Sequence, residues 1–217
     1  MEGYKLLYGE SVDEDIRQEA SRIEGTTEKQ KANLDGEMLE RLAYALFLKN
    51  LGKQFIVART SHHDDAVNHV DTMLLDKENG HLICAFDEVS DINDRFYSEK
   101  QKAVMDRNTR GGSNVKYALR LKDIGDKKVV TPAGAEHIPL FYIALSSNII
   151  REGVRKFKDA HGEQSDFEKQ IFGYFIESIS AQIQGLELED RLTSLNPKLK
   201  ERLLGFKKII EGLKQGN

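Results

Sequence analysis

Two apolar segments of this chain each carry acidic side chains at one end. Residues 70–75 read Val-Asp-Thr-Met-Leu-Leu, and residues 81–89 read His-Leu-Ile-Cys-Ala-Phe-Asp-Glu-Val. An Asn-Gly pair lies between them, and this dipeptide favours the tight turn of a hairpin. Folding as a hairpin would bring Asp71 close to Asp87 or Glu88. Carboxylates that converge at a sheet edge indicate a site for a divalent metal ion.

Such carboxylates suit the metal-dependent hydrolysis of a phosphodiester. The reaction needs two or three carboxylates to hold the ion, which activates water and offsets the charge that develops on the phosphate. Glu40, which precedes both segments, can supply a further oxygen ligand. Successive side chains of a strand point to opposite faces, so only one of Asp87 and Glu88 should join the site, and we favour Asp87.

The elements that must position these acids follow from the hydrophobic pattern. Helical spacing predicts a helix from a cap at Asp35 to about Asn50, and β-branched and aromatic residues predict a strand at 53–60. Further helices are expected at 95–107, from Ser146 or Ser147 to about 158, at 166–184 and at 197–213, and strands at 115–121, 127–130 and 138–145. The order is typical of an α/β core with a mixed sheet and extra helices at both ends.

With this order of elements, the chain resembles the PD-(D/E)xK nuclease superfamily over about residues 34–158. Glu40-Arg41-Leu42, the glycine after the helix and the strand that follows are similar to the opening of the archaeal Holliday-junction resolvases. Val70-Asp71 looks like the first metal-binding aspartate of the family. The resemblance implies a restriction-endonuclease-like sheet flanked by helices, with Glu40, Asp71 and Asp87 holding Mg²⁺ or Mn²⁺. It implies an endonuclease that acts on DNA phosphodiester bonds.

The third motif departs from the pattern of the family, which has an acid, any residue and then lysine. Here Asp87-Glu88-Val89 places valine third, and the frame that begins at Glu88 places serine there. In some members the lysine lies on the following helix, where Lys100 and Lys102 are available. Without such a lysine, the alternative is a nuclease fold kept as a nucleic-acid or protein binding module that does not cleave.

A second cluster, Ser61-His62-His63-Asp64-Asp65 with His69, is dense in residue types that bind metals. It is similar to the His-Asp pairs of metal phosphohydrolases, so a phosphohydrolase that uses His62, His63 and Asp64 is a further alternative. Those enzymes are helical, whereas this segment lies between two predicted strands. We therefore expect a polar loop near the nuclease site.

Contacts with nucleic acid are expected to be local, because the net charge of −4 and a pI near 5.9 are not typical of a nucleic-acid binder. The segment 107–116 combines cations, amides and glycines, and its Arg107, Arg110 and Lys116 could contact a phosphate backbone. The basic residues after Pro197 indicate a solvated helix face.

The length of 217 residues and a hydrophobic content of 39% suit one domain with helical additions. We expect an N-terminal helical arm at 1–33, the nuclease-like core at 34–160, and C-terminal helices at 161–217 packed on that core. The single cysteine, Cys84, lies in an apolar run and predicts a buried side chain in a reducing compartment. The chain shows neither a signal peptide nor a membrane span, so we expect a cytoplasmic protein that binds DNA, with a homodimer allowed.

Overall fold

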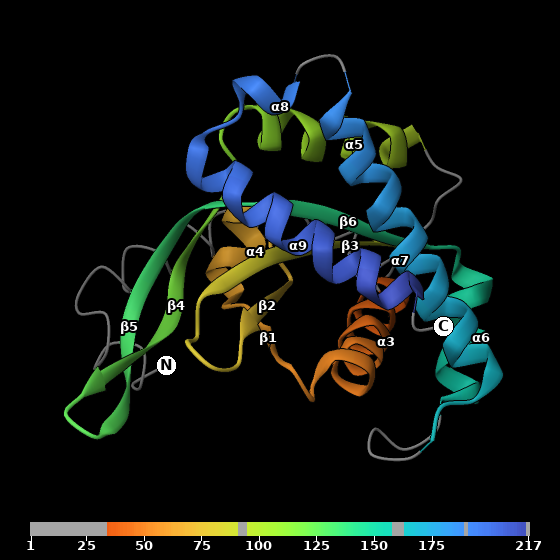
Figure 1. The fold of residues 1–217 in the computed structure, drawn as a ribbon. Coiled ribbons are helices and arrows are strands. Elements are labelled where there is room, and N and C mark those ends of the chain that lie inside the picture. The colour runs from red at the N-terminus through yellow and green to blue at the C-terminus, as the bar shows by residue number, and fades with distance from the viewer. Residues whose placement is uncertain (1–33, 91–94, 158–162, 189–190, 216–217) are drawn as a thin grey trace.

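The apolar runs pair into a mixed sheet at the centre of the protein (Figure 1). The structure is a computed structural model that describes residues 34–90, 95–157, 163–188 and 191–215; the predicted arm at 1–33 lies outside them. Within these ranges the central sheet has the strand order β1-β2-β3-β6. Its strands are β1 (Phe55–Arg59), β2 (Thr72–Asp76), β3 (Leu82–Ser90) and β6 (Leu140–Leu145). The first three are antiparallel and β6 is parallel to β3, which confirms the predicted mixed sheet.

Helices cover both faces of this sheet, because the side chains of its strands alternate between two apolar clusters. Phe86 and Phe141 face a core built with α3, α7 and α9, whereas Ala85 and Leu140 face α5 and a second sheet. Phe47 of α3 stacks on Phe86 with ring centroids 4.6 Å apart. Burying a side chain of this size contributes about 1.5–3 kcal/mol. The described helices are α3 (Leu34–Leu51), α4 (His62–Asn68), α5 (Arg95–Thr109), α6 (Ser147–Lys156), α7 (Asp166–Glu187), α8 (Arg191–Ser194) and α9 (Pro197–Gln215).

The second sheet is a long hairpin that extends away from the central sheet (Figure 1). It consists of β4 (Ser113–Ile124) and β5 (Lys127–Ile138), so both strands run beyond their predicted limits. The strand predicted at 138–145 is confirmed as β6, but it begins later than predicted: Ile138 is the last residue of β5, and β6 begins after Pro139. A proline has no backbone N–H to donate, so it separates the two strands.

The exposed edge of β6 is closed by two amide side chains. Asn108 of α5 donates to the Leu140 carbonyl at 2.7 Å and accepts from the Leu140 N–H at 3.0 Å. Gln182 of α7 makes the same pair of bonds with Tyr142, both at 3.0 Å. These contacts satisfy backbone groups that an edge strand would otherwise present to solvent.

Two expectations about local structure need correction. The helix predicted to begin with a cap at Asp35 begins at Leu34 instead. Asp35 lies within its first turn and accepts two hydrogen bonds from Arg151 of α6, at 2.9 and 3.0 Å. The segment at 62–68, expected as a polar loop, is the short helix α4, whose first turn is capped by the Ser61 side chain. A hydroxyl that accepts a backbone N–H in this way stabilises the start of a helix.

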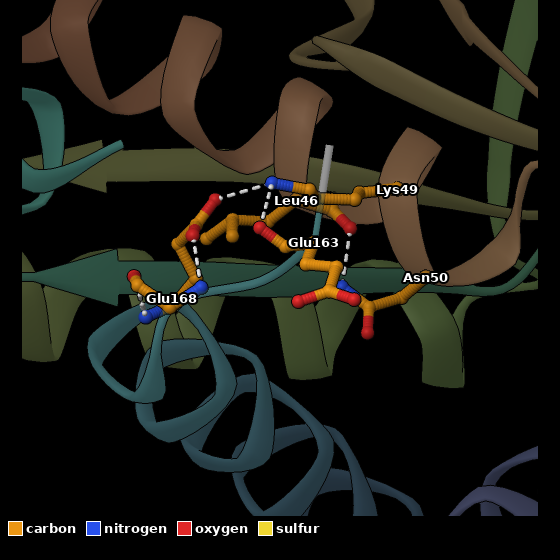
Figure 2. Close-up of polar contacts among 6 residues, drawn as sticks. Leu46, Lys49, Asn50, Glu163 and Glu168 are labelled. Atoms are coloured by element: carbon orange, nitrogen blue, oxygen red, sulfur yellow. Dashed lines mark hydrogen bonds and ion pairs between the residues drawn. The ribbon is translucent and has the colours of Figure 1, made fainter. Parts of the chain in front are cut away.

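A buried ion pair ties α3 to α7 (Figure 2). Lys49 Nζ lies 2.8 Å from Glu168 Oε1, and the two side chains are 5% and 1% exposed. Glu168 also forms a capping box with Ser165 at the start of α7. Burial raises the pKa of Glu168, but the hydrogen bonds from Lys49 and Ser165 outweigh it and leave this pKa below its ordinary value. The pair therefore holds a charged carboxylate inside the protein with its partners supplied.

Candidate active site

Asp71 lies immediately before β2, and backbone hydrogen bonds fix it to the strands on both sides. Its N–H donates to the Phe86 carbonyl at 2.9 Å, and its carbonyl accepts the Thr60 N–H at 3.0 Å. Its side chain turns toward β3, where Oδ2 accepts the Glu88 N–H at 2.7 Å. Burial, together with the negative charge of Asp87, raises the pKa of Asp71 to about 8. The hairpin thus brings Asp71 to the acids of β3.

Asp87 is buried on β3 and meets a lysine of the next helix. Lys100 Nζ, from α5, lies 2.7 Å from Asp87 Oδ2, with side-chain exposures of 32% for the lysine and 5% for the aspartate. Burial raises the pKa of Asp87, while the charge of Lys100 acts in the opposite direction. Of the two lysines that the sequence left open, Lys100 therefore reaches the acids, whereas Lys102 is exposed on α5.

Glu88 is a third acid at this position, and it is poorly supplied with hydrogen-bond donors. Both of its carboxylate oxygens are buried, and neither accepts a hydrogen bond within the part of the chain that the structure describes. Burial raises the pKa of Glu88 well above its ordinary value, and the neighbouring charge of Asp71 raises it further. As consecutive residues of β3, Asp87 and Glu88 lie on opposite faces of the strand. Asp71 nevertheless interacts with both, because it accepts the Glu88 backbone N–H and the negative charge of Asp87 raises its pKa.

One acid of this group was missed by the sequence interpretation. Asp65 of α4 is near enough for its negative charge to raise the pKa values of Asp71 and Asp87, although burial is the larger cause for both. It does the same to Glu40, whose pKa is raised first by burial. The sequence interpretation placed Asp65 in the separate histidine-rich cluster, because its segment was expected to be a loop, in which the direction of a side chain has no fixed period.

Glu40 lies at the margin of the group. Its carboxylate forms an ion pair with Arg59 at the end of β1, and the charge of Arg59 partly offsets the effect of burial on the pKa of Glu40. Asp65 links it electrostatically to Asp71 and Asp87. Glu40 is therefore placed to support the site from the side of β1 while it is held by a cation of its own.

The three predicted nucleic-acid contacts have different surroundings. Arg107 of α5 donates to the Asn68 carbonyl, and its positive charge acts on Asp87. It therefore belongs to the acid group, not to an open loop. Arg110 is exposed at the end of α5, and Lys116 of β4 lies in a surface pocket.

The histidine-rich helix α4 does not bring its metal-ligand types together. Asp64 is fully buried and accepts hydrogen bonds from the backbone N–H groups of Lys116 at 2.7 Å and Tyr117 at 3.0 Å. Ser61 and Asn68 donate to it as well. Its oxygens are therefore occupied in anchoring β4 to α4, and the geometry does not favour a phosphohydrolase built on His62, His63 and Asp64.

The carboxylates of Asp71, Asp87 and Glu88 have the donor chemistry for a divalent cation, although they are not arranged as a finished metal site. Across the described ranges, no group of three His, Cys, Asp or Glu side chains has the arrangement needed to hold a metal. The raised pKa values of these three neighbouring acids show that burial disfavours their charged forms more than nearby positive charges favour them. Hard oxygen ligands of this kind suit Mg²⁺ or Mn²⁺.

Comparisons with known proteins return no relative of this chain. No family model matches it, and neither a curated protein nor a solved structure is similar to it. Its mixed α/β architecture and the geometry of its acids are thus the basis for any functional assignment. Separately, no helix in the described part of the chain is long and apolar enough to cross a membrane.

Proposed function

We propose that this protein is a metal-dependent nuclease with a restriction-endonuclease-like core, acting on DNA phosphodiester bonds. The observation that carries the proposal is the placement of Lys100 Nζ 2.7 Å from Asp87 Oδ2, beside the buried Asp71 of the neighbouring strand. Two carboxylates can hold the metal ion that such a hydrolysis uses, and a nearby amine can assist the reaction. The chain order α3, β1, α4, β2, β3, α5, β4, β5, β6 supports the proposal, because without α4 and the β4–β5 hairpin it is the helix, three strands, helix and strand that the resemblance implies.

Each side chain has a role that follows from its position. Asp71 and Asp87 would hold Mg²⁺ or Mn²⁺, with Glu40 in support. The bound ion would supply an activated water and offset charge on the phosphate. Lys100 is held by Asp87, which directs its amine toward the same group of acids, where it can orient the attacking water and stabilise negative charge on the phosphate oxygens. Arg107 adds a second positive charge near Asp87.

The position of Lys100 is the reason to favour a nuclease that cleaves DNA over a binding module without a catalytic lysine. The sequence lacks lysine in the third motif, and Lys100 on α5 reaches the carboxylate that a motif lysine would accompany. A cation at this point also lowers the free energy of a buried ionised aspartate.

The first test is cleavage of single-stranded, duplex and branched DNA with Mg²⁺ or Mn²⁺. We expect the native chain to cleave at least one form and Asp71→Asn, Asp87→Asn and Lys100→Met to lose roughly 100-fold or more of the rate. Two controls, Asp123→Asn and Lys53→Met, change the same residue types at exposed positions far from the acids in sequence. Equal cleavage by all variants would overturn the proposal. So would a native chain that cleaves no DNA form, which would favour the binding module.

Metal binding needs a readout that does not depend on cleavage. Calorimetric titration of the native chain with Mg²⁺ at pH 8 should show saturable binding accompanied by proton release, because Asp71, with a pKa of about 8, must lose its proton to become a ligand. Asp71→Asn should reduce that proton release. Binding with no release of protons in the native chain would contradict a role for Asp71 as ligand.

A further inference from the structure

A pocket of about 600 Å³ opens between the β4–β5 hairpin, α4 and the start of α9, and basic side chains dominate it. Lys116 and Arg120 come from β4, and Lys198 and Arg202 come from α9. The carboxylate that lines the same pocket is Glu136 of β5. Four cations against one acid give the pocket a positive potential in a protein whose net charge is −4.

Two of these cations lie near each other without an acid to pair them. Arg202 is half-buried, and its pKa is lowered first by burial and then by the positive charge of Arg120, while the negative charge of Glu201 acts in the opposite direction. No carboxylate of the described residues forms an ion pair with either guanidinium. Arg202 instead donates to the backbone carbonyls of Glu136 at 2.5 Å and His137 at 3.1 Å. Like charges held together in a concave site are stabilised when an anion binds between them.

The wall of the pocket is also rigid. His137 has a φ of 59°, a left-handed conformation that is uncommon for a residue other than glycine. Its Nδ1 lies 2.8 Å from the Gly111 carbonyl oxygen, which can only accept, and therefore Nδ1 is the donor of this hydrogen bond. Its Nε2 then accepts from the Asn196 side-chain amide at 3.4 Å. The residue is thus fixed between the end of α5 and the start of α9. Strained residues that are held by surrounding contacts occur often at ligand sites.

We propose that this pocket binds the phosphate backbone of DNA and anchors the strand beside the cleavage site. The choice of DNA as ligand rests on the proposed nuclease function, whereas the preference for phosphate rests on the cations alone. Arginine and lysine side chains from two separate elements can contact successive phosphates of one strand. A pocket of this kind fixes the position of DNA without reading its sequence.

Helix α4 connects this pocket to the acids. His63 and Asn68 line the pocket, while Asp65 of the same helix influences Asp71 and Asp87. The carbonyl of Asn68 accepts the guanidinium of Arg107, whose charge acts on Asp87. The two sites therefore adjoin one short helix.

The test measures binding of fluorescent DNA by anisotropy in EDTA, at several salt concentrations, so that cleavage plays no part. Arg120→Glu and Lys198→Glu should each weaken binding roughly tenfold and reduce the slope of log affinity against log salt by about one. The matched control is Lys208→Glu, the same charge reversal at an exposed position of α9 outside the pocket, which should stay within twofold of native. Arg202 is left unchanged because its backbone contacts hold β5.

Each outcome of these binding measurements supports or overturns the assignment of the pocket as a DNA-backbone site. Native affinity in both pocket variants would overturn it, as would an equal loss in Lys208→Glu, which would show a diffuse charge effect. Inorganic phosphate and a nucleoside monophosphate serve as competitors. If the monophosphate binds tightly in an Arg120-dependent way while DNA binding ignores the pocket variants, the pocket belongs to a small phosphorylated ligand. Because EDTA removes cleavage from the assay, failure of the nuclease proposal would leave these measurements intact.

Discussion

The protein buries acidic side chains in two regions and treats them in opposite ways. At the junction of α3 and α7, Glu168 has Lys49 and the backbone of its own helix as partners, and its pKa is lowered despite burial (Figure 2). At the junction of β2, β3 and α5, burial prevails, and the pKa values of Asp71, Asp87 and Glu88 are all raised. The carboxylate between α3 and α7 therefore has enough partners to stay charged, whereas the acids between β2, β3 and α5 do not.

The difference separates structural acids from candidates for chemistry. A carboxylate that exists to hold helices together is matched by donors, because an unmatched buried charge costs several kcal/mol. Acids that remain unmatched reduce the stability of the fold, so their presence indicates another use. Lys100 compensates Asp87 only in part, and within the described residues Glu88 receives no hydrogen bond to its oxygens.

The largest expected effect comes from breaking the completed pair. Lys49→Met leaves Glu168 charged and buried, so the free energy of unfolding should fall by about 3–5 kcal/mol in urea denaturation. The control is Lys214→Met, which removes an ion pair to Glu177 whose side chains are 35% and 65% exposed and should cost at most about 1 kcal/mol. Equal losses of unfolding free energy in the two variants would show that the Lys49–Glu168 pair is no more important to the fold than an exposed ion pair.

Asp71→Asn should instead increase the free energy of unfolding. The pKa of Asp71 is about 8 in the folded protein against an ordinary 3.8, so the folded state binds more protons between these values. Its contribution to the free energy of unfolding therefore falls as pH rises from about 4 to about 8. The variant should be more stable than native by on the order of 2–4 kcal/mol at pH 8 and nearly equal to it at pH 4.

Thermal denaturation across this pH range measures the effect, with Asp123→Asn as the exposed control. A variant that is equally destabilised at both pH values would show that Asp71 serves the fold mainly as a hydrogen-bond acceptor for Glu88.

Glu88→Gln should have the smallest effect. Burial raises the pKa of Glu88 well above its ordinary value, which favours the neutral carboxyl, and the amide of glutamine is similar to that form in charge and shape. We expect a change within about 0.5 kcal/mol of native in the same assay. A loss of several kcal/mol would indicate that Glu88 is charged in the folded protein and paired with a cation.

Much of this arrangement was accessible from the sequence, because it depends on short-range patterns. The Asn79-Gly80 turn predicted the hairpin that brings Asp71 to β3, although the register shift between Leu74 and Leu75 had no signal in the sequence. The proline at the start of α9 marked that helix correctly. Lys100 could be named as a candidate, since helical spacing places it on α5, but choosing it over Lys102 required the packing of α5 on β6.

The parts that were missed depend on contacts between distant residues. Helix α4 has seven residues, too few for a hydrophobic period, and it is held by the bonds of Asp64 to β4. The prediction of a solvated face for the tail was incomplete, because Lys198 and Arg202 line the pocket beside the hairpin. The position of the hairpin relative to α9 has no local signal in either segment.

The amides of Asn108 and Gln182 also restrict how this protein can associate with a second copy. They occupy the Leu140 and Tyr142 backbone groups on the outer side of β6, so a foreign strand has no free ladder to join there. Of the described strands in the central sheet, β1 is the other terminal one. Any growth of this sheet by strand addition, whether in ordered pairing or in aggregation, is therefore directed to β1.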